Sequence, residues 1–114
     1  MKIIYNNIIP FKGFKAINIC GIVFVRKDAS RMTWIDYNHE RIHTEQMKEM
    51  LFIFFYLWYL IEWVVRLFRK GNAYKNISFE QEAYANERVI QYCENRKRFT
   101  WFYYLLWRVY TKLP

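Results

Sequence analysis

The fold is decided by residues 31–70, RMTWIDYNHERIHTEQMKEMLFIFFYLWYLIEWVVRLFRK, which contain neither Gly nor Pro. Thr33 and Asp36 have the spacing of a reciprocal capping pair at the start of a helix. His39 and His43 are four residues apart, so on a helix both side chains project from one face. The sequence therefore predicts a helical region that begins near Thr33 and carries both histidines.

The residues before this region predict β structure. Residues 16–25, AINICGIVFV, alternate β-branched side chains as a strand does, with Gly21 at a bulge or turn. Residues 3–14 could supply a partner strand, and residues 26–30 form a polar loop that ends the sheet. We therefore expect the chain to open with a small N-terminal antiparallel β-sheet.

The residues after the helical region predict further helices. Gly71 and Asn72 break the first helical region, and Ser78 is predicted as the N-cap of a helix that runs toward Arg98. The expected fold class is α+β, and residues 1–114 form a single compact domain. In order, the β-sheet precedes the histidine-bearing helix, an aromatic-rich hydrophobic helix and a glutamate-bearing helix.

The net charge and the placement of the basic residues limit which kinds of partner the chain is expected to bind. The formal net charge is +8, and a positive field attracts nucleic acid, anionic lipid and acidic proteins alike. The basic residues are scattered and accompany no nucleic-acid-binding motif, so we expect no nucleic-acid partner. Polar residues interrupt the apolar N-terminus, so we also expect no cleaved signal peptide and a membrane-associated or cytoplasmic location.

The five residues His39, Glu40, Arg41, Ile42 and His43 match the HExxH pattern. Two imidazoles one helical turn apart can bind one Zn²⁺ ion together, and the intervening Glu40 lies where it can deprotonate a water. The pattern also occurs by chance, as a pair of exposed histidines on a polar turn. However, both histidines of the chain lie within it, which favours a zinc site.

A catalytic zinc ion needs a third protein ligand, and no further histidine exists. The ligand must therefore be a carboxylate or a cysteine from elsewhere in the chain. The acidic segment of residues 79–87, FEQEAYANE, is the best source. The other candidates are Asp28, Asp36, Glu62 and, more weakly, Cys93.

The two segments HERIH (39–43) and EQEAY (80–84) together resemble the minigluzincins and the related integral-membrane gluzincins. In those zinc metallopeptidases, HExxH is followed downstream by a helix that reads Glu-x-x-Ala-Asp. The resemblance covers residues 39–87 and implies that Glu80 is the third zinc ligand and Ala83 a small packing residue. It also implies an extended peptide or protein substrate laid along an edge strand, here residues 16–25.

The sequence departs from that family at Tyr84, which stands where the membrane gluzincins have Asp. Glu87 lies one turn further along the same helix face and could replace the missing carboxylate beside the zinc ligands. Glu82 is the competing ligand, although it points to a different side of the helix from Glu80. The alternative for all three glutamates is a solvated helix start, where acidic residues are favoured in any case.

The separation of Glu80 from His43 constrains the path of the chain. A straight helix from Thr33 to Arg69 would end about 39 Å from His43, and the remaining residues could extend back at most about 36 Å. The helix must therefore bend or end early, or Glu80 must serve a zinc ion in a second subunit of a homodimer. A single transmembrane crossing would separate the two motifs, so no simple one-pass topology is expected.

Residues 51–68 are the most hydrophobic segment, but Glu62 and Arg66 interrupt them. Tryptophans accumulate in and after this segment, and such rings favour membrane interfaces. The tryptophans in question are Trp58, Trp63, Trp101 and Trp107. We therefore expect association with a membrane surface, although the same rings could simply fill a small core.

Two functions follow from these patterns. The first is a zinc-dependent metallopeptidase with Glu40 as general base, held latent if the first fifteen residues form a blocking segment. Tyr74 and Tyr84 are the candidates for stabilising the oxyanion. The alternative is a non-enzymatic, membrane-associated or oligomeric helical protein in which HExxH is incidental.

Overall fold

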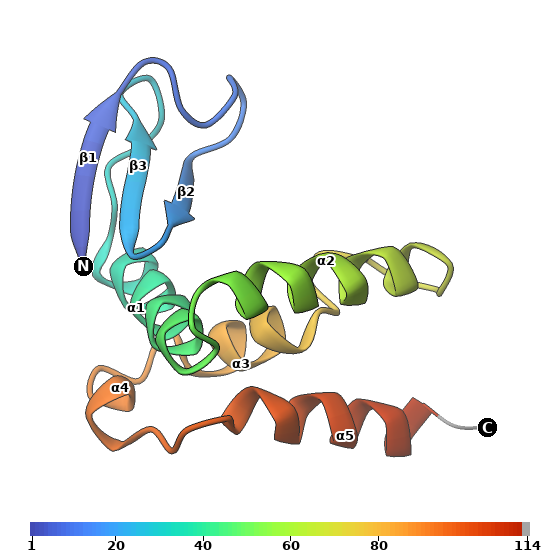
Figure 1. Cartoon of the computed structure of the whole chain (residues 1–114). Helices are drawn as coiled ribbons and strands as arrows, with labels where there is room; N and C mark the ends of the chain where they lie inside the picture. Colours follow the sequence, from blue (N-terminus) through green and yellow to red (C-terminus); the bar gives the residue numbers. More distant parts are fainter. Residues whose placement is uncertain (113–114) are drawn as a thin grey trace.

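The computed structural model describes the backbone of residues 1–112 and the side chains of residues 1–106, so the Trp107 side chain lies outside the described residues. Within this range the chain forms three strands and five helices: β1 (Lys2–Asn6), β2 (Ala16–Ile19), β3 (Ile22–Arg26), α1 (Trp34–Glu49), α2 (Ile53–Leu67), α3 (Ser78–Asn86), α4 (Tyr92–Asn95) and α5 (Thr100–Lys112). The sheet stands at one end, and α2, α3 and α5 extend away from it (Figure 1). The predicted α+β class is confirmed.

The sheet is mixed, whereas an antiparallel sheet was expected. Its strand order is β1-β3-β2, with β2 antiparallel and β1 parallel to β3. Residues 16–25 do not form one strand, because the chain turns at Cys20 and Gly21 into a β2–β3 hairpin. The hairpin accounts for the antiparallel β2–β3 pair, and β1 adds to the other edge of β3 in the parallel direction. Val23 and Val25 of the central strand are fully buried.

Helix α1 begins as predicted and then breaks sharply. Thr33 and Asp36 form the expected capping box, in which each side chain accepts a hydrogen bond from the other residue's backbone N–H. After α1, Leu51 and Phe52 adopt positive φ angles of 53° and 59°, and α2 leaves at 111° to α1. The prediction that the helix bends or ends early is therefore confirmed.

The structure yields one finding on membrane crossing. In the part of the chain that it describes, no single helix combines the length and hydrophobicity that a bilayer crossing requires. The bent pair of α1 and α2 meets those criteria together, by length and composition alone.

Helix α3 starts differently from the prediction. Ser78 is its first residue rather than its N-cap, and the N-cap Ile77 provides no side-chain hydrogen bond. Instead, Glu62 of α2 accepts hydrogen bonds from both the backbone N–H and the hydroxyl of Ser78. A buried carboxylate from another helix thus accepts a hydrogen bond from a backbone N–H group that the first turn of α3 leaves unpaired. The helix also ends at Asn86 rather than continuing toward Arg98.

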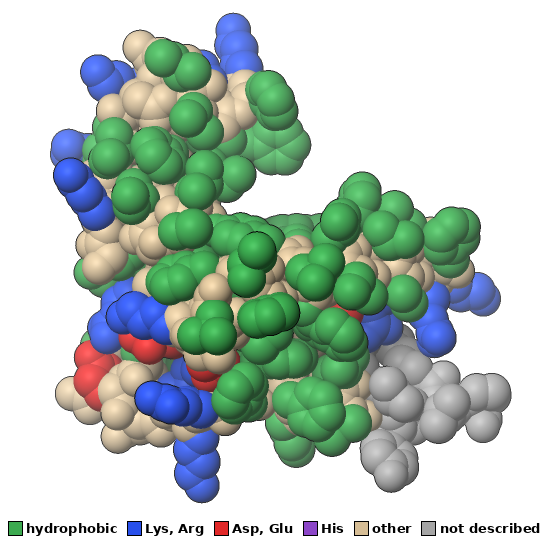
Figure 2. Space-filling model, viewed as in Figure 1, with side chains coloured by type: hydrophobic (Ala, Val, Ile, Leu, Met, Phe, Trp, Pro, Cys, Tyr) green, Lys and Arg blue, Asp and Glu red, His purple; other side chains and the backbone are tan. Residues whose placement is uncertain are grey.

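The main core lies where α1, α2, α3 and α5 meet. It consists of Met47, Phe55, Ile77, Phe79 and Trp101, with Phe55 and Phe79 stacked at a centroid distance of 4.4 Å. Only Phe55 and Glu62 of α2 are buried. Trp58 and Tyr59 are partly buried against the core, and the other apolar side chains of α2 are exposed. Figure 2 shows hydrophobic side chains gathered over this helix.

Candidate metal centre

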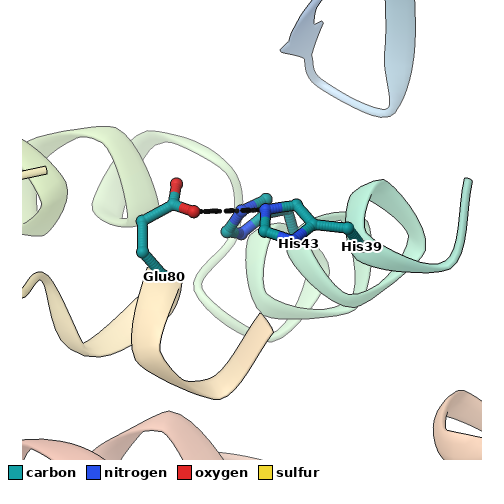
Figure 3. A group of neighbouring side chains, drawn as sticks. All are labelled: His39, His43 and Glu80. Atoms are coloured by element: carbon teal, nitrogen blue, oxygen red, sulfur yellow. Dashed lines mark hydrogen bonds and ion pairs between the residues drawn. The ribbon is translucent and has the colours of Figure 1, made fainter. Parts of the chain in front are cut away.

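The two histidines of α1 face the first turn of α3. His39 and His43 are 8% and 5% exposed, and Glu80 is 3% exposed. Figure 3 shows the Glu80 carboxylate of α3 pointing at both imidazole rings of α1. The bend after α1 returns the chain, so Glu80 reaches the histidines of its own subunit.

The three side chains bring their ligand atoms together in a small triangle. His39 Nε2 and His43 Nε2 are 3.1 Å apart. Glu80 Oε1 lies 3.2 Å from His39 Nε2 and 3.1 Å from His43 Nε2. Among the described residues, this is the group of histidine, cysteine and acidic side chains whose spacing suits a metal ion.

The hydrogen bonds at the far side of each ring determine which nitrogen carries the proton. His39 Nδ1 lies 2.8 Å from the Glu87 carboxylate, which only accepts, so Nδ1 is the donor. The Gln46 amide nitrogen donates to the Phe79 carbonyl and to Glu82, so its oxygen faces His43 Nδ1 at 2.8 Å. When both rings are neutral, each Nε2 atom therefore turns a lone pair toward Glu80.

The electrostatics of the triangle favour a bound positive charge. Burial works to lower the pKa of His43, but Glu80 and Glu40 outweigh it and raise the value to about 9. Burial likewise opposes ionisation of Glu80, yet the two histidines hold its pKa well below the ordinary range. A proton on His43, or a metal ion among the three ligand atoms, would supply that positive charge at these separations of 3.1–3.2 Å.

These residues fit a zinc ion in both chemistry and spacing. Two imidazole nitrogens and one carboxylate oxygen form a common ligand set for catalytic zinc. Ligand atoms around a tetrahedral zinc with bonds of about 2.0–2.1 Å lie about 3.3 Å apart. The observed separations of 3.1–3.2 Å are close to that value. The hydrogen bonds from Nδ1 to Glu87 and Gln46 are the kind that orient metal-binding histidines.

Two adjoining cavities, together called the cleft, border the candidate metal centre. One cavity of about 380 Å³ includes His43 and Glu80 in its lining, and another of about 420 Å³ includes His39. Three residues, Ala16, Glu40 and Tyr74, line both cavities. Burial raises the pKa of Glu40, while His43 and His39 oppose that rise.

One wall of this cleft is the edge strand β2. In the β2–β3 register, Ala16 and Asn18 occupy positions whose backbone groups point away from β3. The Asn18 carbonyl accepts a hydrogen bond from the Tyr56 hydroxyl, and the Asn18 side chain donates to the Glu40 carbonyl on α1. The edge is thereby fixed beside Glu40, and the backbone of Ala16 faces the cleft. The expected edge strand of residues 16–25 is reduced to β2, because β3 is central.

Glu87 and Tyr84 both contact the His39 ring. The Tyr84 ring packs edge-on against the His39 ring at a centroid distance of 4.7 Å. The carboxylate that approaches His39 Nδ1 comes from Glu87, one turn further along. The structure thus places Glu87 at the position considered for it when Tyr84 replaces the family's Asp.

The other candidate ligands do not reach the histidines. Glu82 is buried on a different side of α3, where it binds Arg96, Tyr92 and Gln46. Glu62 binds Ser78, and the remaining candidates lie in other contacts. Asp28 pairs with Arg26, Asp36 pairs with Lys15, and Cys93 is half-buried in α4.

The first fifteen residues are the candidate for a blocking segment. Strand β1 pairs with β3 on the sheet edge opposite β2, so it does not lie in the cleft. Of these residues, Phe14 and Lys15 line the cavity next to His39.

Sequence reasoning gave no role to three residues that support the site. Gln46 orients His43, Tyr59 donates a 3.0 Å hydrogen bond to Glu80 Oε2, and Arg96 binds both Glu82 and Glu49. Gln46 follows His43 by three residues on the same helix face, which was the one available signal. Tyr59 and Arg96 are remote from the motifs in sequence, so only the folded chain reveals their contacts.

The comparisons with known proteins found no match, so the proposed function rests on the residues described above. No protein-family model matches the chain, and no significant match was found among curated proteins or among solved structures.

Proposed function

We propose that this chain is a zinc-dependent metallopeptidase of the gluzincin type, with zinc held by His39, His43 and Glu80. The observation that carries the proposal is the convergence of two Nε2 atoms and one carboxylate oxygen within 3.1–3.2 Å. A buried carboxylate needs a positive charge beside it, and a zinc ion shared by the three atoms would supply one. Its position in a cleft beside a free strand edge supports a catalytic rather than a purely structural site.

The residues of the cleft have distinct roles in this proposal. A zinc ion, when bound, would supply a Lewis acid that polarises the scissile carbonyl and increases the acidity of a water. Glu40 takes a proton from the attacking water and gives it to the leaving amine nitrogen. The substrate backbone pairs with the free edge of β2 at Ala16 in an extended conformation.

Tyr74 is the better candidate for stabilising the developing oxyanion. It lines both cavities together with Glu40, whereas Tyr84 lines only the cavity beside His39. Burial and the nearby Glu80 raise the pKa of Tyr74, so its hydroxyl stays protonated and able to donate.

Substitution Glu40→Gln tests this proposal with little change in side-chain shape. We expect hydrolysis of a fluorescently labelled unfolded protein to fall by a factor of roughly 100 or more, because a general base is lost. Zinc content should be retained, since Glu40 is not a ligand. Glu45→Gln, on the same helix but outside the cleft, is the matched control. Unchanged hydrolysis by zinc-loaded Glu40→Gln would exclude the proposed role.

A further inference from the structure

Helix α2 turns its charged residues inward and its apolar residues outward, the opposite of an ordinary amphipathic surface helix. Its two charged residues face inward, where Glu62 binds Ser78 and the Arg66 side chain is 13% exposed. The opposite side, here called the outer face of α2, is entirely apolar. It consists of Ile53, Leu57, Leu60, Val64, Leu67 and Phe68, which are between 41% and 87% exposed.

The outer face of α2 is larger than a single exposed side chain could explain. Four further apolar residues beside it are also exposed, so the patch is wider than one row of side chains. Figure 2 shows hydrophobic side chains gathered over this helix. They are Phe54, Ile61, Trp63 and Val65. Contiguous apolar patches of more than a few hundred Å² mark interaction sites on soluble proteins. An apolar phase or an apolar partner must therefore cover this helix.

The charges around the patch indicate an anionic partner. All ten acidic side chains are already engaged, either in ion pairs with Lys or Arg or in the metal centre. The first group contains Asp28, Asp36, Glu45, Glu49, Glu62, Glu82 and Glu94, and the second contains Glu40, Glu80 and Glu87. The exposed residues Arg69 and Lys70 directly follow α2, and the chain carries a net charge of +8.

We propose that the outer face of α2 docks into the surface of an anionic lipid bilayer. A helix of 15 residues is about 22 Å long, shorter than the hydrocarbon core of about 30 Å, so α2 lies in the interface rather than across it. Its apolar side chains enter the acyl region, while Arg69 and Lys70 meet the lipid phosphates. A second copy of the chain is disfavoured as the occupant, because two chains of charge +8 repel each other.

This docking would also fix the position of the cleft. Tyr56 and Tyr59 of α2 line the cavity that contains His43 and Glu80. The cleft would therefore lie close to the membrane surface whether or not it binds zinc.

Vesicle flotation tests the proposal with the full chain and needs neither zinc nor hydrolysis. The probes are vesicles of phosphatidylcholine alone and vesicles with added phosphatidylglycerol. We expect binding to the anionic vesicles that weakens as salt rises. Leu60→Glu should reduce the bound fraction roughly tenfold or more, because a leucine that the bilayer would bury is replaced by a charge. Leu57→Gln is the milder second variant and should reduce binding less.

Ile90→Glu is the matched control, because Ile90 is 72% exposed and lies between α3 and α4, away from α2. It should bind vesicles like the wild-type chain. Circular dichroism and light scattering establish the fold and the oligomeric state of each variant. Three results would overturn the proposal: no binding by the wild-type chain, equal binding by Leu60→Glu, or a wild-type dimer that Leu60→Glu converts to monomers. The last result would assign the outer face of α2 to a second copy.

Discussion

The interface between α1 and α3 and the outer face of α2 distribute polar and apolar residues in opposite ways. The α1–α3 interface buries His39, His43, Gln46, Glu80 and Glu82. The outer face of α2 exposes leucine, isoleucine, valine and phenylalanine side chains to solvent. In most small domains the interior is apolar and the exposed helix faces are polar. Both regions of this chain reverse that arrangement.

The contrast shows that neither region is arranged for stability alone. A buried cluster of ionisable groups is usually no more stable than well-packed apolar residues of similar volume. An exposed apolar helix face gains nothing from folding and favours aggregation. Sites where a chain departs from the ordinary rules are where function is expected. A cation would account for the interior cluster, and a bilayer would account for the outer face of α2.

The largest expected effect concerns the buried ion pairs of Arg96 beside the candidate metal centre. Arg96 binds Glu49 and Glu82, and the three side chains are at most 4% exposed. Arg96→Met leaves two buried carboxylates without their partner, so we expect the free energy of unfolding to fall by about 3–5 kcal/mol. Urea denaturation measures this change, with the exposed Arg98→Met as control. A loss equal to that of the control would show that the polar interior is dispensable.

Zinc removal gives the next largest effect. A ligand at 100 times its Kd stabilises the folded state by about 2.7 kcal/mol. Thermal unfolding should therefore shift to lower temperature when a chelator is added to the zinc-loaded chain. Glu80→Gln should unfold at the same temperature with and without chelator. If the wild-type chain also shows no shift, the interior cluster is not a metal site.

A smaller effect is expected from Gln46→Met, which removes the oxygen that faces His43 Nδ1. Loss of such an orienting contact weakens zinc binding by about 10- to 100-fold. Competition with a fluorescent zinc chelator measures the affinity, and the visible spectrum of the Co²⁺-substituted chain reports a change at the ligands themselves. Gln91→Met, at an exposed position, is the control. Unchanged affinity and an unchanged Co²⁺ spectrum would remove Gln46 from the site.

The smallest effect is expected on the outer face of α2. Leu57 is 53% exposed, and leucine and glutamine have similar helix propensities. Leu57→Gln should therefore change the free energy of unfolding by no more than about 0.5 kcal/mol. Phe55→Ala, on the buried side of the same helix, should cost about 3–5 kcal/mol by comparison. A large loss for Leu57→Gln would show that this face is buried against protein.

The sequence predicted the fold class, the capped start of α1 and the need for a bend, because these depend on local pattern and chain length. It did not predict where the bend lies, since Leu51 and Phe52 carry no Gly or Pro signal for positive φ. It also missed that β3 inserts between β1 and β2. Strand order depends on long-range packing, which alternation within one segment does not encode.

The candidate site was partly predictable, because some of its residues follow from local sequence pattern. HExxH fixes the spacing of His39 and His43 on one helix, and the acidic segment of residues 79–87 offers a carboxylate. The contacts of Glu82 with Arg96 and of Glu62 with Ser78 were not predictable, because each joins two helices distant in sequence.

Zinc content per chain tests the central claim most directly. The wild-type chain and His39→Ala would be loaded with zinc, dialysed and measured by inductively coupled plasma mass spectrometry. Three ligands from α1 and α3 predict about one zinc ion per wild-type chain and none in His39→Ala. Equal zinc content in the two proteins would contradict the account.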